Sequence, residues 1–439
     1  MDTRPHVIYS ISTIASLLQW AVKRPQPTPG SYHPASRPAY ATFLLENLSD
    51  LWHLLLELPY VLQSEPLSSQ ANEDGRAERL TVRWSALDLA MAELKMRELM
   101  SGSLPPDFLE SLAPQVVVRC WLLATSPKMI LETEHSLSII YDCGSGDIEK
   151  IVSFVDKAIA LKTISPRQFV KRCNSRLRLQ DVLDHELVYL MNDLGFFCCH
   201  EKMQLARVQD RDHIVLLLHA AQRQLCHGRQ DDETHILEMT FSHILRIMPD
   251  DMARFRYMHD FFRSLAMLLG RATVLAALEP SDSPVGKRGM KHIREMLAFF
   301  AVNCITQGPA NPADYGPGCS DFVGSVQHVW RTAYDKLRSL PADAAPHKSE
   351  ALALWTDFGR HCEIDTSAPA PPLPSTAGRD GWSKDMGCAW RECLCFGEKP
   401  QHKLRKCNGC GKIMYCSKKC QRRDWTEGGH KSVCRSSSQ

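Results

Sequence analysis

Apolar residues recur every three or four positions along most of the chain up to Cys362, the spacing of helices that bury one stripe. The clearest stripes are Leu44, Leu48, Leu51, Leu55 and Leu58; Leu237, Phe241, Ile244 and Met248; Met258, Phe261, Leu265, Leu268, Ala272 and Leu275; Ile293, Leu297, Phe300 and Cys304; and Val326, Trp330, Ala333, Leu337 and Leu340. The alternating pattern of strands is almost absent. The pattern therefore predicts an all-helical body.

The segments between the apolar stripes predict where the helices end. Residues 25–38, 64–79, 280–287 and 307–318 are rich in Pro, Gly, Ser and Asp, and we expect loops there. The first stripe should stop at Pro59. Ser165 before Pro166 has the pattern of an N-cap followed by a proline in the first turn, so a helix should begin at that point.

The arrangement of these helices is less constrained than their existence. Helix pairs stack readily along a long chain, so we favour an irregular α-solenoid or helical-repeat body. No fixed repeat period is visible, and a globular helical bundle stays open as the alternative. We expect a helical scaffold over residues 1–362, a proline-rich linker over 363–380 and a separate unit over 381–439.

Charge and cysteine set this last unit apart. The whole chain has a formal charge of +2, but residues 381–439 contain 13 Lys and Arg against 5 Asp and Glu, which is +8, and this leaves −6 for the rest. Of the 17 cysteines, eight fall between Cys388 and Cys434. An apolar core alone gives marginal stability to a unit this small, so the cysteines should hold it together.

The cellular compartment decides between disulfides and metal. The apolar stretch of residues 7–22 lacks a positive segment before it and is interrupted by polar residues, so we do not expect export. The chain contains no run of 18 apolar residues without a charge, so we do not expect a membrane span. We expect an intracellular protein, nuclear or cytoplasmic, whose thiols are reduced and available to a metal.

The cysteine spacing suits zinc. Cys407 and Cys410 form a Cys-x2-Cys knuckle, and one helical turn separates the members of two further pairs. The full set of expected ligands is Cys388, Cys393, Cys407, Cys410, Cys416, Cys420, His430 and Cys434. Eight thiolate and imidazole ligands fill two closed tetrahedral sites, which are structural and not catalytic.

The residues Tyr415-Cys416-Ser417-x-x-Cys420-Gln421, Trp425 and His430-x3-Cys434 resemble a MYND-type zinc finger, in the wider-spaced form found in fungi. The resemblance implies interleaved pairs: Cys388, Cys393, Cys416 and Cys420 on one zinc, and Cys407, Cys410, His430 and Cys434 on the other. It covers residues 388–434 and does not extend to the helical body. Cys395 is an alternative to Cys393, and we interpret His402 as a solvated histidine.

Gln421 and Trp425 lie four residues apart and should project from one face of a short helix. An indole and an amide donor suit proline-rich peptides, and MYND domains similar to this one bind such peptides there. The alternative for Trp425 is packing in the small core of the module. The segment from Pro369 to Pro374 has the composition of such a peptide, but we interpret it as linker.

Other functions have weaker support. The basic tail lacks the interleaved aromatic residues of a nucleic-acid surface, so we do not expect direct nucleic-acid binding. Residues 137–146, an apolar run followed by Asp142, Gly144 and Gly146, give the best hint of an enzyme, an S-adenosylmethionine-dependent methyltransferase. A turn before a helix near Asp147 also explains this segment. We therefore expect a non-enzymatic zinc-binding adaptor that recruits proline-containing partners, with a role in transcriptional regulation as one setting; the partner and the oligomeric state are open.

Overall fold

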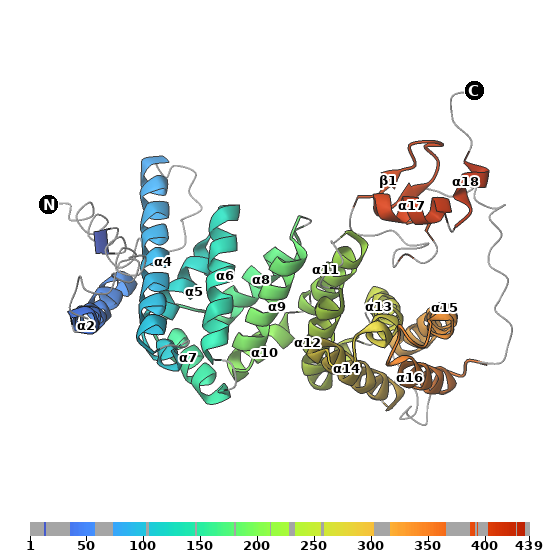
Figure 1. The fold of residues 1–439 in the computed structure, drawn as a ribbon, viewed down its shortest axis with the longest axis horizontal. Helices are drawn as coiled ribbons and strands as arrows, with labels where there is room; N and C mark the ends of the chain where they lie inside the picture. The colour runs from blue at the N-terminus through green and yellow to red at the C-terminus, as the bar shows by residue number, and fades with distance from the viewer. Residues whose placement is uncertain are drawn as a thin grey trace, which may run out of the picture. The chain divides into compact units, whose positions relative to one another are not determined.

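The computed structural model describes residues 13–14, 36–57, 73–101, 105–144, 147–179, 181–210, 212–227, 233–255, 259–302, 317–365, 387–390, 393, 403–426 and 428–434. These residues are almost entirely helical, with two short strands near the C-terminus (Figure 1). The prediction of a mainly α fold with a small cysteine-rich C-terminal region is confirmed. None of the described helices is long and apolar enough to cross a bilayer.

The chain divides into two compact units. Unit 1 comprises Met1–Cys173 and Tyr189–Gln209, and unit 2 comprises Asn174–Val188 and Asp210–Gln439. Unit 2 thus contains part of the helical body together with the cysteine-rich region. The predicted linker lies outside the described residues except for its first three, so the boundaries at 362 and 380 stay predictions.

Unit 1 is built from helices that pack through apolar side chains. Its elements are α2, Ser36–Glu57; α4, Glu73–Ser101; the 3-10 helix η1, Pro106–Glu110; α5, Ala113–Leu123; α6, Pro127–Gly144; α7, Ile148–Ala160; most of α8, Pro166–Leu177; most of α9, Asp184–Phe197; and α10, Glu201–Gln209. Four of these helices meet through aromatic rings. The Phe169 ring lies 4.7 Å from that of Phe197 and 5.4 Å from that of Trp121, and Phe154 lies 6.2 Å from Phe197. Burying rings of this size is a main source of core stability.

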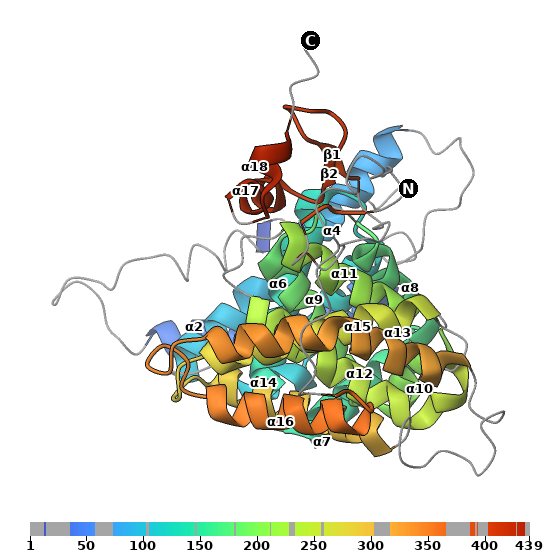
Figure 2. The same cartoon turned by 90° about the vertical axis from the view of Figure 1, so that its right-hand side faces the viewer.

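The helices of unit 2 gather around α13. They are α11, His213–His227; α12, Glu233–Phe255; α13, His259–Leu278; α14, Pro284–Phe300; α15, Pro317–Ser339; and α16, Lys348–His361. α13 contacts the other five and packs most extensively against α15 (Figure 2). Contacts with so many helices are typical of a bundle and not of a solenoid, in which each repeat contacts its neighbours alone. For unit 2 taken by itself, the structure therefore favours the bundle alternative.

Two tryptophans join α15 to α16. The Trp330 Nε1–H donates to the carbonyl oxygen of Trp355 at 2.8 Å, and the Trp355 Nε1–H donates to the carbonyl oxygen of Trp330 at 3.0 Å. Both indoles are buried, so this exchange satisfies their polar atoms without water. Gly359 lies so close that a Cβ there would overlap the Trp330 indole nitrogen. The helix contact therefore requires glycine at this position.

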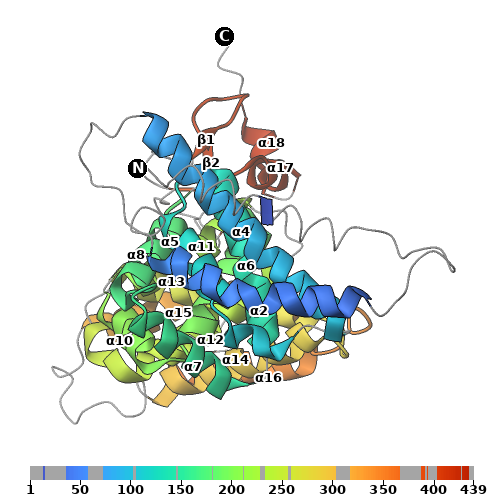
Figure 3. The same ribbon diagram turned by 90° about the vertical axis from the view of Figure 1, so that its left-hand side faces the viewer.

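Several helices begin inside segments that we predicted to be loops. α2 begins at Ser36, α4 at Glu73, α14 at Pro284 and α15 at Pro317, each inside a segment that we expected to be loop (Figure 3 shows α2 and α4). In three of these helices a proline lies in the first turn, where its missing N–H leaves no bond unmade. Such prolines mark helix starts as well as loops.

The Ser-Pro pattern accounts for two helix starts, one that we predicted and one that we did not. α8 begins at Pro166 as predicted. The same pattern begins α14, where the Ser283 hydroxyl accepts a hydrogen bond from the Gly286 N–H at 3.1 Å. α12 also runs through Pro249 to Phe255, beyond the end of its predicted apolar stripe. These boundaries are corrections to the sequence analysis.

The cysteine-rich region has four short elements. They are β1, Arg405–Lys406; β2, Met414–Tyr415; α17, Lys418–Thr426; and α18, His430–Val433. The strands pair antiparallel, with Arg405 opposite Tyr415 and Lys406 opposite Met414. Because this region has so little regular structure, its fold depends on the interactions of its cysteine side chains.

Candidate metal centre

A tight turn between β1 and β2 carries the Cys407 and Cys410 knuckle. The Cys407 N–H donates to the Ile413 carbonyl oxygen at 2.8 Å, and the Gly411 N–H donates to the Cys407 carbonyl oxygen at 2.9 Å. Gly411 has φ of 63°, in the left-handed region that favours glycine. These bonds fold the chain back between the two cysteines, so both sulfurs can reach one ion.

One group of residues has all its ligand atoms within 4.8 Å of one another and consists of Cys407, Cys410, His430 and Cys434. Because its residues come later in the chain than most of the other set, we call this group the second cluster. The Cys407 and Cys434 sulfurs are 3.8 Å apart, and the His430 Nε2 lies 3.3 Å from the Cys407 sulfur and 3.8 Å from the Cys410 sulfur. Tetrahedral zinc with Zn–S bonds of about 2.3 Å places its ligand sulfurs about 3.8 Å apart. The second cluster therefore has the spacing of a closed zinc site, with Nε2 as the histidine donor.

Cys388, Cys393, Cys416 and Cys420 form the first cluster. The sulfurs of Cys388, Cys393 and Cys420 lie within 4.8 Å of one another, and the Cys393 sulfur is 3.7 Å from that of Cys420 and 3.6 Å from that of Cys416. The Cys416 N–H points to the Cys388 sulfur at 3.5 Å. The second quartet that the resemblance implies is thus grouped in full. Of the first quartet, Cys388, Cys393 and Cys420 form one group, and Cys416 lies beside Cys393.

The start of α17 positions Cys416 and Cys420. The Ser417 hydroxyl accepts a hydrogen bond from the Cys420 N–H at 3.2 Å, as an N-cap does. Cys416 just before the helix and Cys420 in its first turn then face the same ion. Further along, the buried Asp424 accepts a hydrogen bond from the Tyr415 hydroxyl at 2.8 Å, which ties α17 to β2.

The pKa values of the cluster thiols shift in both directions. Hydrogen bonds from the thiols of Cys388, Cys393 and Cys416 lower the pKa of Cys420 far below its usual range. In the second cluster, burial raises the pKa of Cys434 to about 12, and the neighbouring Cys407 thiol adds to the effect. Several thiolates cannot share so small a volume without a compensating positive charge, and a divalent cation supplies it. The donor set, four sulfurs and three sulfurs with one imidazole, fits zinc.

Gln421 and Trp425 both lie on α17 as expected, but their surroundings differ. The Trp425 side chain is 39% exposed, and its ring meets the His430 ring edge-on at 5.9 Å between centroids. The Gln421 amide donates to the Cys407 sulfur at 3.6 Å. Trp425 is therefore both packed on one face and open to solvent on the other, whereas the Gln421 amide is engaged with a metal ligand.

Other residues from the sequence analysis cannot be placed. Cys395, His402 and the segment from Pro369 to Pro374 lie outside the described residues. The structure places Cys393 in the first cluster, and the choice of Cys393 as the ligand stays a prediction.

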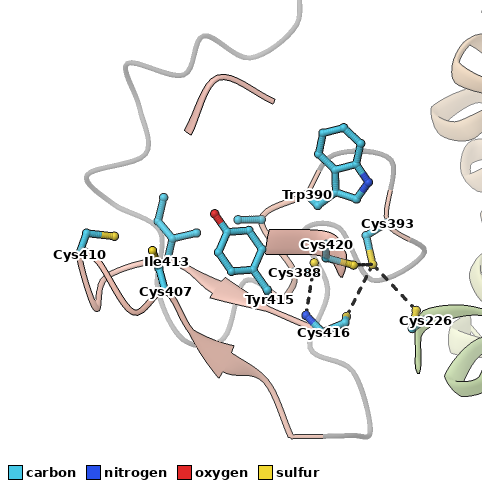
Figure 4. Packing of buried hydrophobic residues seen from close by; sticks show 11 residues of the cluster. Cys226, Cys388, Trp390, Cys393, Cys407, Cys410, Ile413, Tyr415, Cys416 and Cys420 are labelled. Atoms are coloured by element: carbon cyan, nitrogen blue, oxygen red, sulfur yellow. Dashed lines mark hydrogen bonds between the residues drawn. The ribbon is translucent and has the colours of Figure 1, made fainter. Parts of the chain in front are cut away.

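One cysteine near the metal centre is not apparent from the sequence. Cys226, in the last turn of α11, lies with its sulfur 3.9 Å from that of Cys393 and belongs to a group with Cys393 and Cys416 (Figure 4). It lies 167 residues before Cys393, and nothing in its local sequence distinguishes it from the other cysteines of the helical body. Only the folded chain brings it to the cluster.

The segment that suggested a methyltransferase is helical. Residues 137–144 form the end of α6, and the Asp147 side chain caps α7 by accepting a hydrogen bond from the Lys150 N–H at 3.1 Å. A Cβ on Gly144 would lie 2.9 Å from Leu109 Cδ1, so helix packing explains this glycine. The strand end that a nucleotide-like cofactor needs is not formed by these described residues.

Comparison with protein-family models gives one match, to the MYND finger, over residues 388–434. Searches of curated proteins and of solved structures found no match. Residues 388–434 are therefore a MYND-type zinc finger, a zinc-binding domain that commonly mediates protein–protein interaction.

Proposed function

We propose that this protein is a non-enzymatic intracellular adaptor whose finger, held by two structural zinc ions, recruits partner proteins through proline-containing segments. The observation that carries the proposal is the half-open indole of Trp425 on α17, fixed beside a metal ligand. Direct recognition of nucleic acid and catalysis are no part of this function. A role in transcriptional regulation, in the nucleus or the cytoplasm, is one setting for it.

Zinc preorganises the binding face. His430 lies in the second cluster and contacts the Trp425 ring, so the ion would fix the indole through the imidazole. A fixed side chain loses little entropy when a ligand binds. Peptide binding should therefore require zinc even though zinc does not touch the peptide.

The chemistry of a polyproline segment matches this face. Its pyrrolidine rings stack on an aromatic surface, and its backbone carbonyl groups make no internal hydrogen bonds. Gln421 can donate to such a carbonyl group only if its amide leaves the Cys407 sulfur or shares its second hydrogen, so we assign the main contribution to Trp425.

The test is binding of the zinc-loaded full-length chain to an array of proline-rich peptides, with Trp425→Ala as the variant. The matched control is Leu205→Ala, which removes an exposed apolar side chain from α10 in unit 1. Binding that needs zinc, is lost in Trp425→Ala and survives in Leu205→Ala supports the proposal. Equal binding by all three proteins, or binding by none, would refute it.

The alternative enzyme function has its own test. A methyltransferase must bind S-adenosylmethionine, and calorimetry with the full-length chain measures this directly. Micromolar affinity would replace the adaptor proposal with the methyltransferase.

A further inference from the structure

Five sulfurs at the first cluster form two groups of three that share Cys393, and five is one more than a tetrahedral ion takes. Four belong to the finger, and the fifth is that of Cys226 in α11 of the helical body (Figure 4). Cys226 is 8% exposed and shares a buried cluster with Trp390, Tyr415 and the finger cysteines. Its thiol therefore faces the metal centre and not solvent.

The spacing of the fifth sulfur is that of a ligand. Cys226 lies 3.9 Å from Cys393, compared with 3.6 Å between Cys393 and Cys416 and 3.7 Å between Cys393 and Cys420. All three values are close to the edge of about 3.8 Å of a tetrahedral zinc–thiolate site. Cys393 belongs to two groups of three sulfurs, with Cys388 and Cys420 in one and with Cys226 and Cys416 in the other.

An electrostatic interaction also links the finger to this part of the helical body. Lys419, beside the ligand Cys420, has a buried ammonium nitrogen. Among the charges that act on it are Glu233, at the start of α12, and Arg271 of α13, which pair with each other at 2.8 Å. Charges at the start of α12 therefore act on the finger, and Cys226 at the end of α11 lies against its cysteines.

We propose that Cys226 is an exchangeable fifth thiolate of the first zinc site, which can replace Cys388 and thereby fasten the finger to the end of α11 through the metal. The proposal rests on the zinc occupancy of the proposed function. With zinc bound, one zinc–sulfur bond to Cys388 would break and one to Cys226 would form, and the proton that Cys226 loses would pass to the departing Cys388 thiolate. No redox change takes place.

Cys388 is the finger ligand to exchange for two reasons. Cys226 forms a group with Cys393 and Cys416, so an ion that accepts Cys226 keeps these two. Of the remaining pair, Cys420 lies in the capped first turn of α17 and cannot withdraw without breaking that turn. Cys388 has no such constraint from a helix.

The test counts zinc in the full-length chain by elemental analysis after gel filtration. We expect two zincs in the wild type, two in Cys388→Ala and one in the double variant Cys388→Ala/Cys226→Ala. The matched control, Cys388→Ala/Cys199→Ala, removes a half-buried cysteine of unit 1 instead and should keep two. The far-ultraviolet circular dichroism of each variant monitors the helical body.

The outcomes separate the two proposals. A wild type with fewer than two zincs would refute the zinc assignment itself, and with it this inference. A wild type with two zincs but a Cys388→Ala variant with one or none would refute only the role of Cys226. Two zincs in the Cys388→Ala/Cys226→Ala variant would also refute it, because the site would then close without Cys226.

Discussion

Burial raises the pKa of cysteines in the helical body, whereas hydrogen bonds outweigh burial at two cysteines of the finger. In the body, burial raises the pKa of Cys120 and of Cys362 to about 12, and it raises that of Cys173 well above the usual value. In the finger, neighbouring thiols lower the pKa of Cys420. For Cys410, amide donors and the thiols of its cluster outweigh burial and also lower the pKa, whereas burial raises the pKa of Cys434 to about 12.

The difference shows that burial alone does not decide what a cysteine does. A single thiol among hydrocarbon stays protonated and acts as a small apolar side chain. A thiol among other donors loses its proton readily to a metal. The body is therefore stabilised by packing and the finger by coordination, and changes that affect one should spare the other.

Removal of zinc should separate the two regions most strongly. Structural zinc contributes about 10 to 16 kcal/mol of apparent binding free energy in small finger peptides, more than a unit this small gains from packing. After chelation we expect trypsin to cleave rapidly after basic residues between 403 and 431, while the helices of unit 1 and α12 to α16 resist. Rapid digestion of those helices as well would contradict the separation.

Truncation of the tryptophan pair should have the opposite selectivity. Trp355→Ala removes a buried indole and leaves the Trp330 carbonyl oxygen without its donor, at a cost of about 3 to 5 kcal/mol in free energy of unfolding. Urea denaturation followed by circular dichroism measures this cost, and the zinc content should not change. The control Trp425→Ala, at an exposed site, should shift the midpoint little; a larger shift than that of Trp355→Ala would contradict this prediction.

Acid should act in opposite directions on the zinc sites of the finger and on Asp193 of unit 1. In the finger, protons compete with zinc for thiolates, so zinc is released as the pH falls. In unit 1, burial raises the pKa of Asp193 well above its usual value, with Glu134 adding to the effect, so its folded-state pKa lies above its unfolded one. The stability that Asp193 contributes is complete below its unfolded pKa and is lost as the pH rises through the folded pKa.

Asp193→Asn tests the second half of this contrast. The amide resembles the neutral carboxyl group, so the variant should be more stable than the wild type at neutral pH and lose its advantage below about pH 4. Unfolding with urea across this range measures the difference, with Glu132→Gln on the exposed face of α6 as the control. A variant that is less stable than wild type at neutral pH would show that the ionised carboxylate is needed.

The smallest effect should come from a helix cap. Ser283→Ala removes the acceptor for the Gly286 N–H and should cost about 1 kcal/mol, whereas Ser283→Asn should keep most of the capping. Thermal unfolding of unit 2 measures both variants. Equal losses in the two would mean that the hydroxyl does not act as the cap.

Local signals predicted most of the fold and the finger. The spacing of apolar residues indicated helices because a buried stripe repeats with the helical period. The cysteine spacing indicated ligands for two zinc sites, and the structure gathers these residues into groups of three and four. Helix starts were less predictable. Pro284 and Pro317 read as loop residues until the helices that they begin are seen.

Long-range features could not be read from the sequence. The contacts of α13 with five helices depend on packing between segments far apart in the chain. Cys226 is one of nine cysteines outside the finger, and only the fold selects it. The sequence predicted correctly that Gln421 lies on a helix. Its contact with Cys407 depends on the β1–β2 hairpin, which brings Cys407 close to α17.

The most direct test of the account is native mass spectrometry of the full-length chain, which weighs the folded protein with its bound metal. We predict a mass increase that corresponds to two zinc ions, both lost on acidification, with the body remaining folded in chelator at neutral pH. One zinc ion or none in the native protein would contradict the account, because the eight cysteine and histidine ligands would then not form two zinc sites.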